Sequence, residues 1–224
     1  MKISFVLPVY NAQSTLAVCI QSLLKQTHDD FEIIIINDGS VDNTERILNS
    51  FKDKKLKIIN RRQPRSGAAV CRNIGNKMVT GQIIAVCDAE IYDKQRGEAI
   101  DSFFIQNKDK SVFYSALYLK DSKNIYEPTL MEAYEWDFNS KCPISHPTVA
   151  YREVVARECP YHEIISETDL YEFMLLDAHR KGYLFGGCQD PLAIKIEGNS
   201  VRNKKEAKLI KQKMYKQYGI NVVL

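Results

Sequence analysis

The chain has 224 residues, a length that suits one domain or at most two and that buries a substantial core without disulfides or structural metals. Hydrophobic residues make up 45% of it and charged residues 26%, with 10 glycines and 7 prolines, so collagen-like and low-complexity sequences are excluded. The 31 Lys and Arg against 28 Asp and Glu give a net charge of +3, which is too small to indicate nucleic-acid binding. Any anionic ligand must therefore bind at a local site.

Cysteine use and the lengths of the apolar runs indicate a cytoplasmic protein. Cys19, Cys71 and Cys87 fall inside apolar periodic segments, and no two of the six cysteines have the spacing of a metal knuckle or a thiol motif. The first apolar run stops at Pro8 without a cleavage site, and no later run is long enough to cross a bilayer. We therefore expect buried, reduced thiols in a protein of the cytoplasm or of the inner face of the membrane.

The first hundred residues repeat a short apolar run, a polar turn and a segment of helical period, an order typical of βαβ units. The runs are continuous rather than alternating, which favours strands of a parallel sheet covered on both faces. The strands are expected at 3–9, 31–36, 56–59 and 82–87, and the helical stripes at 16–24, 47–51 and 68–78, with Ser14 as the N-cap of the first helix.

The second half has a looser pattern of helical and strand-like segments. The expected elements are a helix near 100–104, a strand at 112–119, an extended piece at 147–151, a helix at 167–181 ended by Gly182, a strand at 191–196 and a basic segment at 201–218. No linker or shift in composition separates the halves, which predicts a single domain.

Polar residues follow each of the first four predicted strands, at 8–11, 37–40, 61–67 and 88–90. Ligands of an open parallel sheet lie beyond the carboxyl ends of its strands, so these residues are expected at one ligand-binding edge. A single such cluster is more often a turn, but four in succession with three carboxylates favour a site. No Gly-X-Gly-X-X-Gly follows the first strand and no Gly-Lys-Ser/Thr loop is present, which disfavours a dinucleotide-binding enzyme and a P-loop protein.

The residue types at this edge suit a nucleotide. Tyr10 offers a ring that can stack on a base, the Asp38 carboxylate can accept an imide N–H, and Arg72 can meet a phosphate. Asp88 and Glu90 offer hard oxygen ligands for Mg²⁺ or Mn²⁺. We expect a turn at Ala89, which both carboxylates require to face one cation.

Four segments resemble the successive signatures of glycosyltransferase family 2, which has the GT-A fold. They are Pro-Val-Tyr-Asn at 8–11, Asn-Asp-Gly-Ser-Val-Asp-Asn-Thr at 37–44, Gly-Ala-Ala-Val-Cys-Arg-Asn-Ile-Gly at 67–75 and Gly-Gln-Ile-Ile-Ala-Val-Cys-Asp-Ala at 81–89. Their order and spacing agree with the family over residues 1–90. Farther on, 146–152 resembles the family's segment under the acceptor site and 167–169 its catalytic-base segment, while 91–140 matches poorly.

The resemblance implies an α/β fold of the GT-A type, with a mostly parallel, Rossmann-like sheet flanked by helices and a smaller mixed region on the acceptor side. We expect one domain over 1–224, in which 1–100 binds the nucleotide-sugar and 101–224 binds the acceptor and includes the basic helix 201–218. It also implies inverting transfer of a sugar from a nucleoside diphosphate donor, commonly a UDP-sugar, to a hydroxyl of a saccharide or lipid-linked acceptor.

Carried over by position, the resemblance assigns the site residues. The base would be surrounded by Pro8, Val9 and Tyr10, its N–H would be accepted by Asp38, the nucleotide would be held by Arg72, and the ribose and a Mn²⁺ or Mg²⁺ ion would be bound by Asp88 and Glu90. Asp169 would take the proton of the acceptor hydroxyl, with Glu167 as its competitor.

The chain departs from the family at two acidic motifs. The usual Asp-X-Asp is Asp88-Ala89-Glu90, and the usual adjacent pair of the base segment is split by Thr168. The acidic residues at 167–169 have a second interpretation, in which they only stabilise a helix N-terminus and take no part in catalysis, because the helix dipole favours negative charge there. Many relatives carry an Arg and a His where this chain has Lys195 and Glu197, so no third metal ligand is assigned.

Two other functions remain open. A non-catalytic nucleotide- or glycan-binding protein would keep the fold and lose the reaction, in line with the altered acidic motifs. A sugar nucleotidyltransferase usually needs a Gly-rich basic loop after the first strand, and 8–13 has neither a glycine nor a basic residue. The basic segment 201–218 suits a solvated amphipathic helix, or one that contacts anionic lipid at a membrane surface or the donor diphosphate.

Overall fold

The structure is a computed structural model that describes residues 1–62, 64–119, 124–126, 142–163, 170–196 and 204–219. Its centre is one sheet with the strand order β3-β2-β1-β4-β8-β6-β9-β5, and β7 pairs with β6. The first four strands in this order are parallel, as the βαβ pattern predicts; they are β3 (Leu56–Asn60), β2 (Phe31–Asn37), β1 (Ile3–Val9) and β4 (Ile83–Val86).

The remaining strands make the sheet mixed. β8 runs antiparallel to both β4 and β6, β9 runs parallel to β6, and β5 and β7 pair antiparallel with β9 and β6. Their bounds are β5 (Ile91–Tyr92), β6 (Lys110–Leu119), β7 (Asn124–Tyr126), β8 (Ala150–Arg152) and β9 (Leu184–Lys195). The mixed region of the sheet therefore starts directly beside β4, the strand that leads into Asp88.

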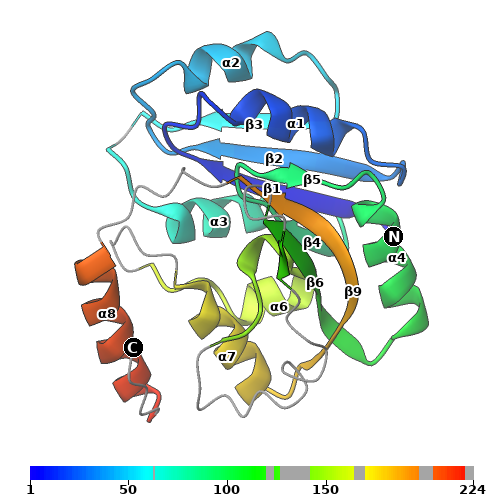
Figure 1. The fold of residues 1–224 in the computed structure, drawn as a ribbon, viewed down its shortest axis with the longest axis vertical. Helices are drawn as coiled ribbons and strands as arrows, with labels where there is room; N and C mark the ends of the chain where they lie inside the picture. The colour runs from blue at the N-terminus through cyan, green and yellow to red at the C-terminus, as the bar shows by residue number, and fades with distance from the viewer. Residues whose placement is uncertain (63, 120–123, 127–141, 164–169, 197–203, 220–224) are drawn as a thin grey trace.

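Helices cover both faces of the sheet (Figure 1). In that view α1 (Leu16–Leu24) and α2 (Thr44–Ser50) lie above the strands, and α3 (Ala68–Asn76), α6 (Glu153–Glu158) and α7 (Tyr171–Arg180) lie below them. The helix α4 (Arg96–Gln106) flanks β6 and β9, and a short 3-10 helix η1 (His146–Thr148) precedes β8.

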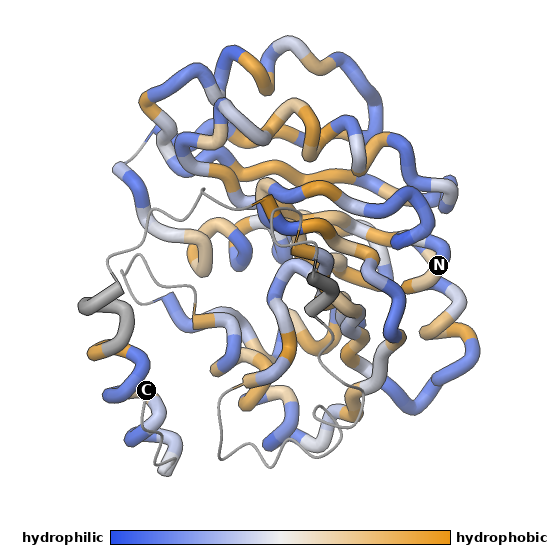
Figure 2. Tube along the Cα trace, viewed as in Figure 1, coloured by the Kyte–Doolittle hydropathy of each residue, from blue (hydrophilic) through white to orange (hydrophobic). Residues whose placement is uncertain are grey.

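Alternate residues of β1 enter different cores, which explains the unbroken apolar runs. Phe5 and Leu7 belong to the cluster under α1 and α4, whereas Val6 belongs to the cluster formed with α6, α7 and α8. Both faces of a central parallel strand are buried, so both must be apolar. Figure 2 shows the result, with hydrophobic residues concentrated along the central strands and hydrophilic residues on the outer turns.

The last described helix, α8 (Lys204–Gln217), lies beside α7 at the edge of the molecule (Figure 1). Glu172 of α7 forms an ion pair with Lys211, 2.8 Å between Nζ and Oε1, and the buried Tyr215 donates to the same carboxylate. Leu209 is 53% exposed. A helix within 201–218 is thus confirmed. No helix within the described ranges combines the length and apolarity needed to span a bilayer.

Several predicted boundaries differ from the structure. The prediction that Ser14 caps α1 is wrong, because Thr15 occupies that position without a side-chain cap bond. The extended piece at 147–151 begins as the turn η1, and the strand expected at 191–196 is the end of the longer β9. The helix expected from 167 is described from Tyr171. All six cysteines are free thiols, and all but the half-buried Cys188 are buried, as expected.

Candidate active site

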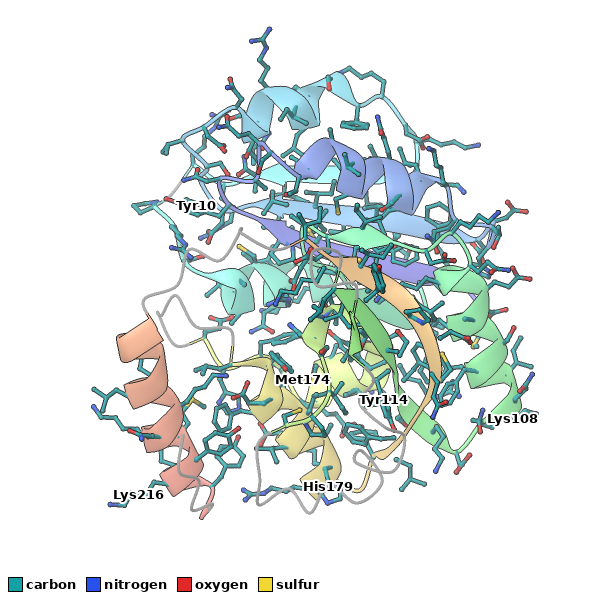
Figure 3. All side chains as sticks on the ribbon, in the orientation of Figure 1. Tyr10, Lys108, Tyr114, Met174, His179 and Lys216 are labelled. Atoms are coloured by element: carbon teal, nitrogen blue, oxygen red, sulfur yellow. The ribbon has the colours of Figure 1, made fainter. Side chains whose placement is uncertain are left out.

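The loops that follow β1 to β4 lie at one edge of the sheet, as predicted. The register pairs Val9 with Asn37 and Asn37 with Asn60, so the three strands end side by side. Figure 3 shows Tyr10 at this edge, on the side where α3 begins and across the molecule from Lys108. Parallel strands thus bring residues that are far apart in the chain to a common rim.

Two of these loops are joined by side-chain to backbone hydrogen bonds. The Asn11 amide donates to Ser40 Oγ at 3.0 Å, Val41 N donates to Asn11 Oδ1 at 3.0 Å, and Ala12 N donates to Thr44 Oγ1 at 2.8 Å. Asn11 has φ 48°, the left-handed region in which asparagine is better tolerated than most residues. The rim around Tyr10 is therefore built by both loops together.

Asp38 is buried at this rim, and the chain itself occupies both of its carboxylate oxygens. Ser66 donates from its N–H at 3.0 Å and from its hydroxyl at 2.9 Å, and Gly67 N donates at 2.7 Å. Arg61 forms an ion pair with the same carboxylate. Because Gly67 precedes α3, Asp38 lies at a helix N-terminus, where free amides and the helix dipole stabilise an anion. A nucleobase N–H that binds Asp38 must therefore share a carboxylate oxygen with one of these donors or replace that donor.

The other residues assigned to the base differ in access. The guanidinium of Arg65 lies 4.5 Å from the centre of the Tyr10 ring, a cation–π distance, so one face of that ring is already stacked. Pro8 is half-buried. The Val9 side chain packs in the core, and its carbonyl accepts the Asp38 amide at 2.9 Å. Tyr10 and Pro8, rather than the Val9 side chain, line the rim.

Arg72 pairs with Asp88 instead of facing solvent. Its Nη2 lies 2.5 Å from Asp88 Oδ1, and its side chain is 2% exposed, compared with 30% for Asp88. The guanidinium also lies 5.5 Å from the centre of the Tyr161 ring. Arg72 is thus brought to the predicted edge, where it offsets the charge of a carboxylate.

The backbone turns tightly at Ala89, as two carboxylates facing one cation require. Glu90 N donates to Asp88 O at 2.7 Å, and Glu90 Oε2 accepts from Ile196 N at 2.6 Å. Burial raises the pKa of Glu90 above its ordinary value, the Ile196 amide opposes this, and the nearby Asp88 charge adds to the increase. We call residues 88–90 the acidic turn.

The acidic turn offers two carboxylates, the hard oxygen donors that Mg²⁺ and Mn²⁺ prefer. One oxygen of each of its carboxylates accepts no hydrogen bond from the described residues, and both groups lie close enough for the Asp88 charge to raise the pKa of Glu90. No group of three His, Cys, Asp or Glu suited to a metal occurs in the part of the chain that the structure describes. Two carboxylates suffice where substrate phosphates and waters complete the octahedron, as Mg²⁺ sites commonly show.

Sequence reasoning missed the residues that support these groups. The sequence places Arg61 and Ser66 at the edge, but their contacts with Asp38 depend on the path of the loop. Tyr92 and Arg96 lie beneath the acidic turn and carry no motif: Tyr92 accepts from the Asp88 amide, and the buried Arg96 donates to Val86 O at 2.8 Å. Only the packing of β5 and α4 under β4 identifies them.

The base candidates Asp169 and Glu167, and also Glu197, lie outside the described residues. The chain that leads toward them is fixed to α3 by Asn73. Tyr161 N donates to Asn73 Oδ1 at 2.9 Å, and Asn73 Nδ2 donates to Tyr161 O at 2.9 Å and to Glu163 Oε1 at 2.8 Å. Neighbouring residues of α3 thus contact both the acidic turn, through Arg72, and this segment, through Asn73.

Comparison with known proteins agrees with this geometry. The family model described as Glycosyl transferase family 2 matches residues 4–156. Glycosyltransferase GlyG of Streptococcus pneumoniae is 29% identical over 160 residues, which cover 62% of this chain and 52% of GlyG, so this chain spans about half the length of that relative.

Two solved structures share the fold at low sequence identity. Staphylococcus aureus TarS in complex with UDP-GlcNAc has a TM-score of 0.75 and 18% identity, over 89% of this chain and 60% of TarS 1–349. The mannosyltransferase PcManGT of Pyrobaculum calidifontis, in complex with GDP-Man and Mn²⁺, has a TM-score of 0.75 and 14% identity, over 100% of this chain and 66% of that one. With the GT-A fold and a family match over more than half of its residues, the chain belongs to glycosyltransferase family 2.

Proposed function

We propose that the chain transfers a sugar from a nucleoside diphosphate donor, of which a UDP-sugar is the first choice, to a hydroxyl of a saccharide or lipid-linked acceptor, with inversion and with the help of Mn²⁺ or Mg²⁺. The observation that carries the proposal is the convergence of Asp38, Arg72 and the acidic turn at one edge of the sheet. The UDP-GlcNAc and GDP-Man complexes of the two structural neighbours support a nucleotide-sugar donor.

In this proposal the nucleoside lies on the rim between the loops after β1 and β2. Tyr10 stacks on the base, either beside Arg65 or in its place. Asp38 accepts the base N–H, and the amide at the start of α3 holds its carboxylate in position. Pro8 completes the wall beside the ring. Stacking on an aromatic ring tolerates different bases, so Asp38 is the group that selects for an N–H donor such as uracil.

The diphosphate lies over the acidic turn, where Asp88 and Glu90 would hold the cation. When bound, a divalent cation neutralises the charge that grows on a departing diphosphate. Arg72 keeps Asp88 oriented and lowers the repulsion between the two carboxylates before the donor arrives. Ile196 fixes Glu90 from the other side through its amide. The chain thus holds both carboxylates in place at the end of β4.

The acceptor half is proposed from the resemblance. Asp169, with Glu167 as its competitor, stays the predicted base that takes the proton from the acceptor hydroxyl. A peripheral membrane contact through the basic helix α8 also stays a proposal, supported by the exposed Lys213 and Lys216 beside Leu209. A location in the cytoplasm or at the inner face of the membrane is proposed on the same ground.

The deciding experiment measures UDP affinity with and without Mn²⁺ together with hydrolysis of UDP-sugars. Asp88→Asn keeps the oxygen that accepts from Arg72, so we expect a folded variant whose turnover falls at least about 100-fold. Asp53→Asn is the matched control, because this exposed carboxylate lies in the turn before β3 and accepts only from Lys55 N among the described residues. Unchanged turnover in Asp88→Asn would contradict the proposed metal site.

These two assays, together with an assay for pyrophosphate release, separate the alternatives. Metal-enhanced UDP binding without turnover for any donor would favour a non-catalytic binding protein. Release of pyrophosphate from a nucleoside triphosphate and a sugar phosphate would favour a nucleotidyltransferase. The comparisons give neither alternative support.

A further inference from the structure

The acidic turn is fixed from beneath by a single buried hydroxyl group. The Asp88 amide donates to Tyr92 Oη at 2.7 Å, and the same hydroxyl donates to the Asp88 carbonyl at 3.2 Å. Tyr92 is 3% exposed. Because one hydroxyl binds both the N–H and the C=O of Asp88, it fixes the direction of the backbone on either side of that residue.

Tyr92 is itself held rigidly by three neighbouring elements. As part of β5 it pairs with Ala193 of β9, and its amide donates to Ser22 Oγ of α1 at 3.1 Å. The guanidinium of Arg96 lies 4.5 Å from the centre of its ring. Arg96 is fully buried. It donates to Val86 O at the end of β4, at 2.8 Å, and to Pro147 O in the short helix η1, at 3.1 Å. The hydroxyl position is therefore set by packing and not by the turn.

The other contacts of the turn are weaker constraints on Asp88. Glu90 N and Cys19 Sγ also donate to the Asp88 carbonyl, at 2.7 and 3.5 Å, but a thiol is a weak donor and the first contact lies within the turn. Among the described residues, the Asp88 amide has Tyr92 Oη as its one acceptor. Without that acceptor the Asp88 amide loses its hydrogen bond, and the peptide before Asp88 is freer to rotate, which would change the direction of the Asp88 side chain.

We propose that Tyr92 is a positioning residue, which orients the Asp88 and Glu90 carboxylates for the cation of the donor complex without touching cation or donor. The proposal rests on the proposed function, because it assigns Tyr92 to the cation site described there. Its physical basis is preorganisation: carboxylates that are already oriented lose less conformational freedom when the cation and diphosphate arrive.

The test is Tyr92→Phe, which keeps the ring and its contact with Arg96 and removes the hydroxyl. Isothermal titration calorimetry measures the affinity for UDP under two conditions, in about 1 mM MnCl₂ and in EDTA. We expect the gain in UDP affinity caused by Mn²⁺ to fall about tenfold, and the affinity in EDTA to stay within about twofold. Tyr215→Phe, which removes a buried hydroxyl that bonds Glu172, should leave both values unchanged.

Two further measurements keep the test decisive. Hydrogen exchange of the metal-free protein should speed up at the Asp88 amide in Tyr92→Phe and not in Tyr215→Phe. If Tyr92→Phe does not fold, Ser22→Ala, which removes the acceptor of the Tyr92 amide and so loosens the position of the Tyr92 hydroxyl, should lower the Mn²⁺-dependent gain by a smaller factor.

The outcomes separate this inference from the function on which it rests. A wild-type protein whose UDP affinity is the same in MnCl₂ and in EDTA removes the proposed cation site and this inference with it. A wild-type Mn²⁺ response that is kept in full by Tyr92→Phe, or by Ser22→Ala where that variant replaces it, overturns this inference alone. If Tyr92→Phe loses the same factor of UDP affinity in MnCl₂ and in EDTA, the inference is also overturned, because Tyr92 then supports nucleotide binding in general and not the cation site.

Discussion

The guanidinium of Arg72 on α3 lies 2.5 Å from the carboxylate of Asp88 at the end of β4, measured from Nη2 to Oδ1. This pair joins a helix that covers one face of the sheet to the turn that carries both predicted metal ligands. A buried cation beside the partly exposed Asp88 means that the site holds a positive charge of its own. The cation site and the N-terminus of α3 are thus parts of one electrostatic unit.

Removing this buried cation should destabilise the fold. Arg72→Met leaves Asp88 without its countercharge, and we expect the free energy of unfolding to fall by about 2 kcal/mol, less than a fully buried pair because Asp88 is 30% exposed. Arg157→Met is the control, since it breaks an exposed pair with Glu153 and should cost less than about 0.5 kcal/mol. If urea unfolding gives the same loss of unfolding free energy for Arg72→Met and Arg157→Met, the Arg72–Asp88 pair is no stronger than a surface pair.

Loss of the Tyr10 ring should weaken nucleotide binding. A stacked base contributes about 1 to 3 kcal/mol, so Tyr10→Ala should raise the Kd for UDP about tenfold or more in isothermal titration. Tyr183→Ala removes a half-buried tyrosine that follows α7 and should leave the Kd unchanged. A Tyr10→Ala protein that binds UDP as tightly as the wild type would exclude the proposed stacking.

The left-handed backbone at position 11 predicts an unusual order of variants. Asn11→Ala and Asn11→Gly both lose the bond from Val41 N, but glycine adopts φ 48° without a β-carbon clash. We expect Asn11→Ala to lower the free energy of unfolding by about 2 kcal/mol and Asn11→Gly by about 1. Chemical unfolding in which glycine is the more harmful substitution would mean that the backbone at this position is not strained.

Acid stability should depend on Glu32, which lies at the opposite edge of the sheet from the site. Burial alone would raise its pKa, but contacts from Lys57, Ser4 and Thr80 together lower it to about 2. A lowered pKa in the folded state gives stability that is complete above the unfolded value of about 4.5 and is lost as pH falls toward about 2.

The corresponding variant is Glu32→Gln, which cannot ionise. It should lower the free energy of unfolding at pH 7 by up to about 3 kcal/mol and flatten its change between pH 4.5 and 2. Glu98→Gln, at an exposed position on α4, should preserve the wild-type pH dependence in guanidinium unfolding. An unaltered acid transition in Glu32→Gln would assign the acid sensitivity to other carboxylates.

The parallel half of the fold could be predicted because its signals are local. The run 3–9 is identical with β1, and the runs for β2, β3 and β4 end within one residue of the observed strands. Parallel neighbours joined by right-handed crossovers must end at the same edge. The meeting of Tyr10, Asp38 and Asp88 at that edge therefore followed from strand order along the chain, before any contact was known.

The mixed half could not be predicted in the same way. The position of β8 between β4 and β6, and the pairing of the two-residue β5 with β9, join segments that are about 40 to 100 residues apart in the chain and leave no periodic pattern. The pairing of β5 with β9 brings Ile196 to Glu90 and fixes Tyr92 under Asp88.

The sequence by itself thus determined the family, the parallel strands and the edge at which the acidic side chains meet, because apolar runs and motif order depend on neighbours in the chain. Tertiary structure alone decided which group each charged side chain contacts: Asp38 binds Ser66 and Gly67, and Arg72 binds Asp88. Buried charges must find partners wherever packing brings donors within reach, and that reach is set by the three-dimensional path of the chain.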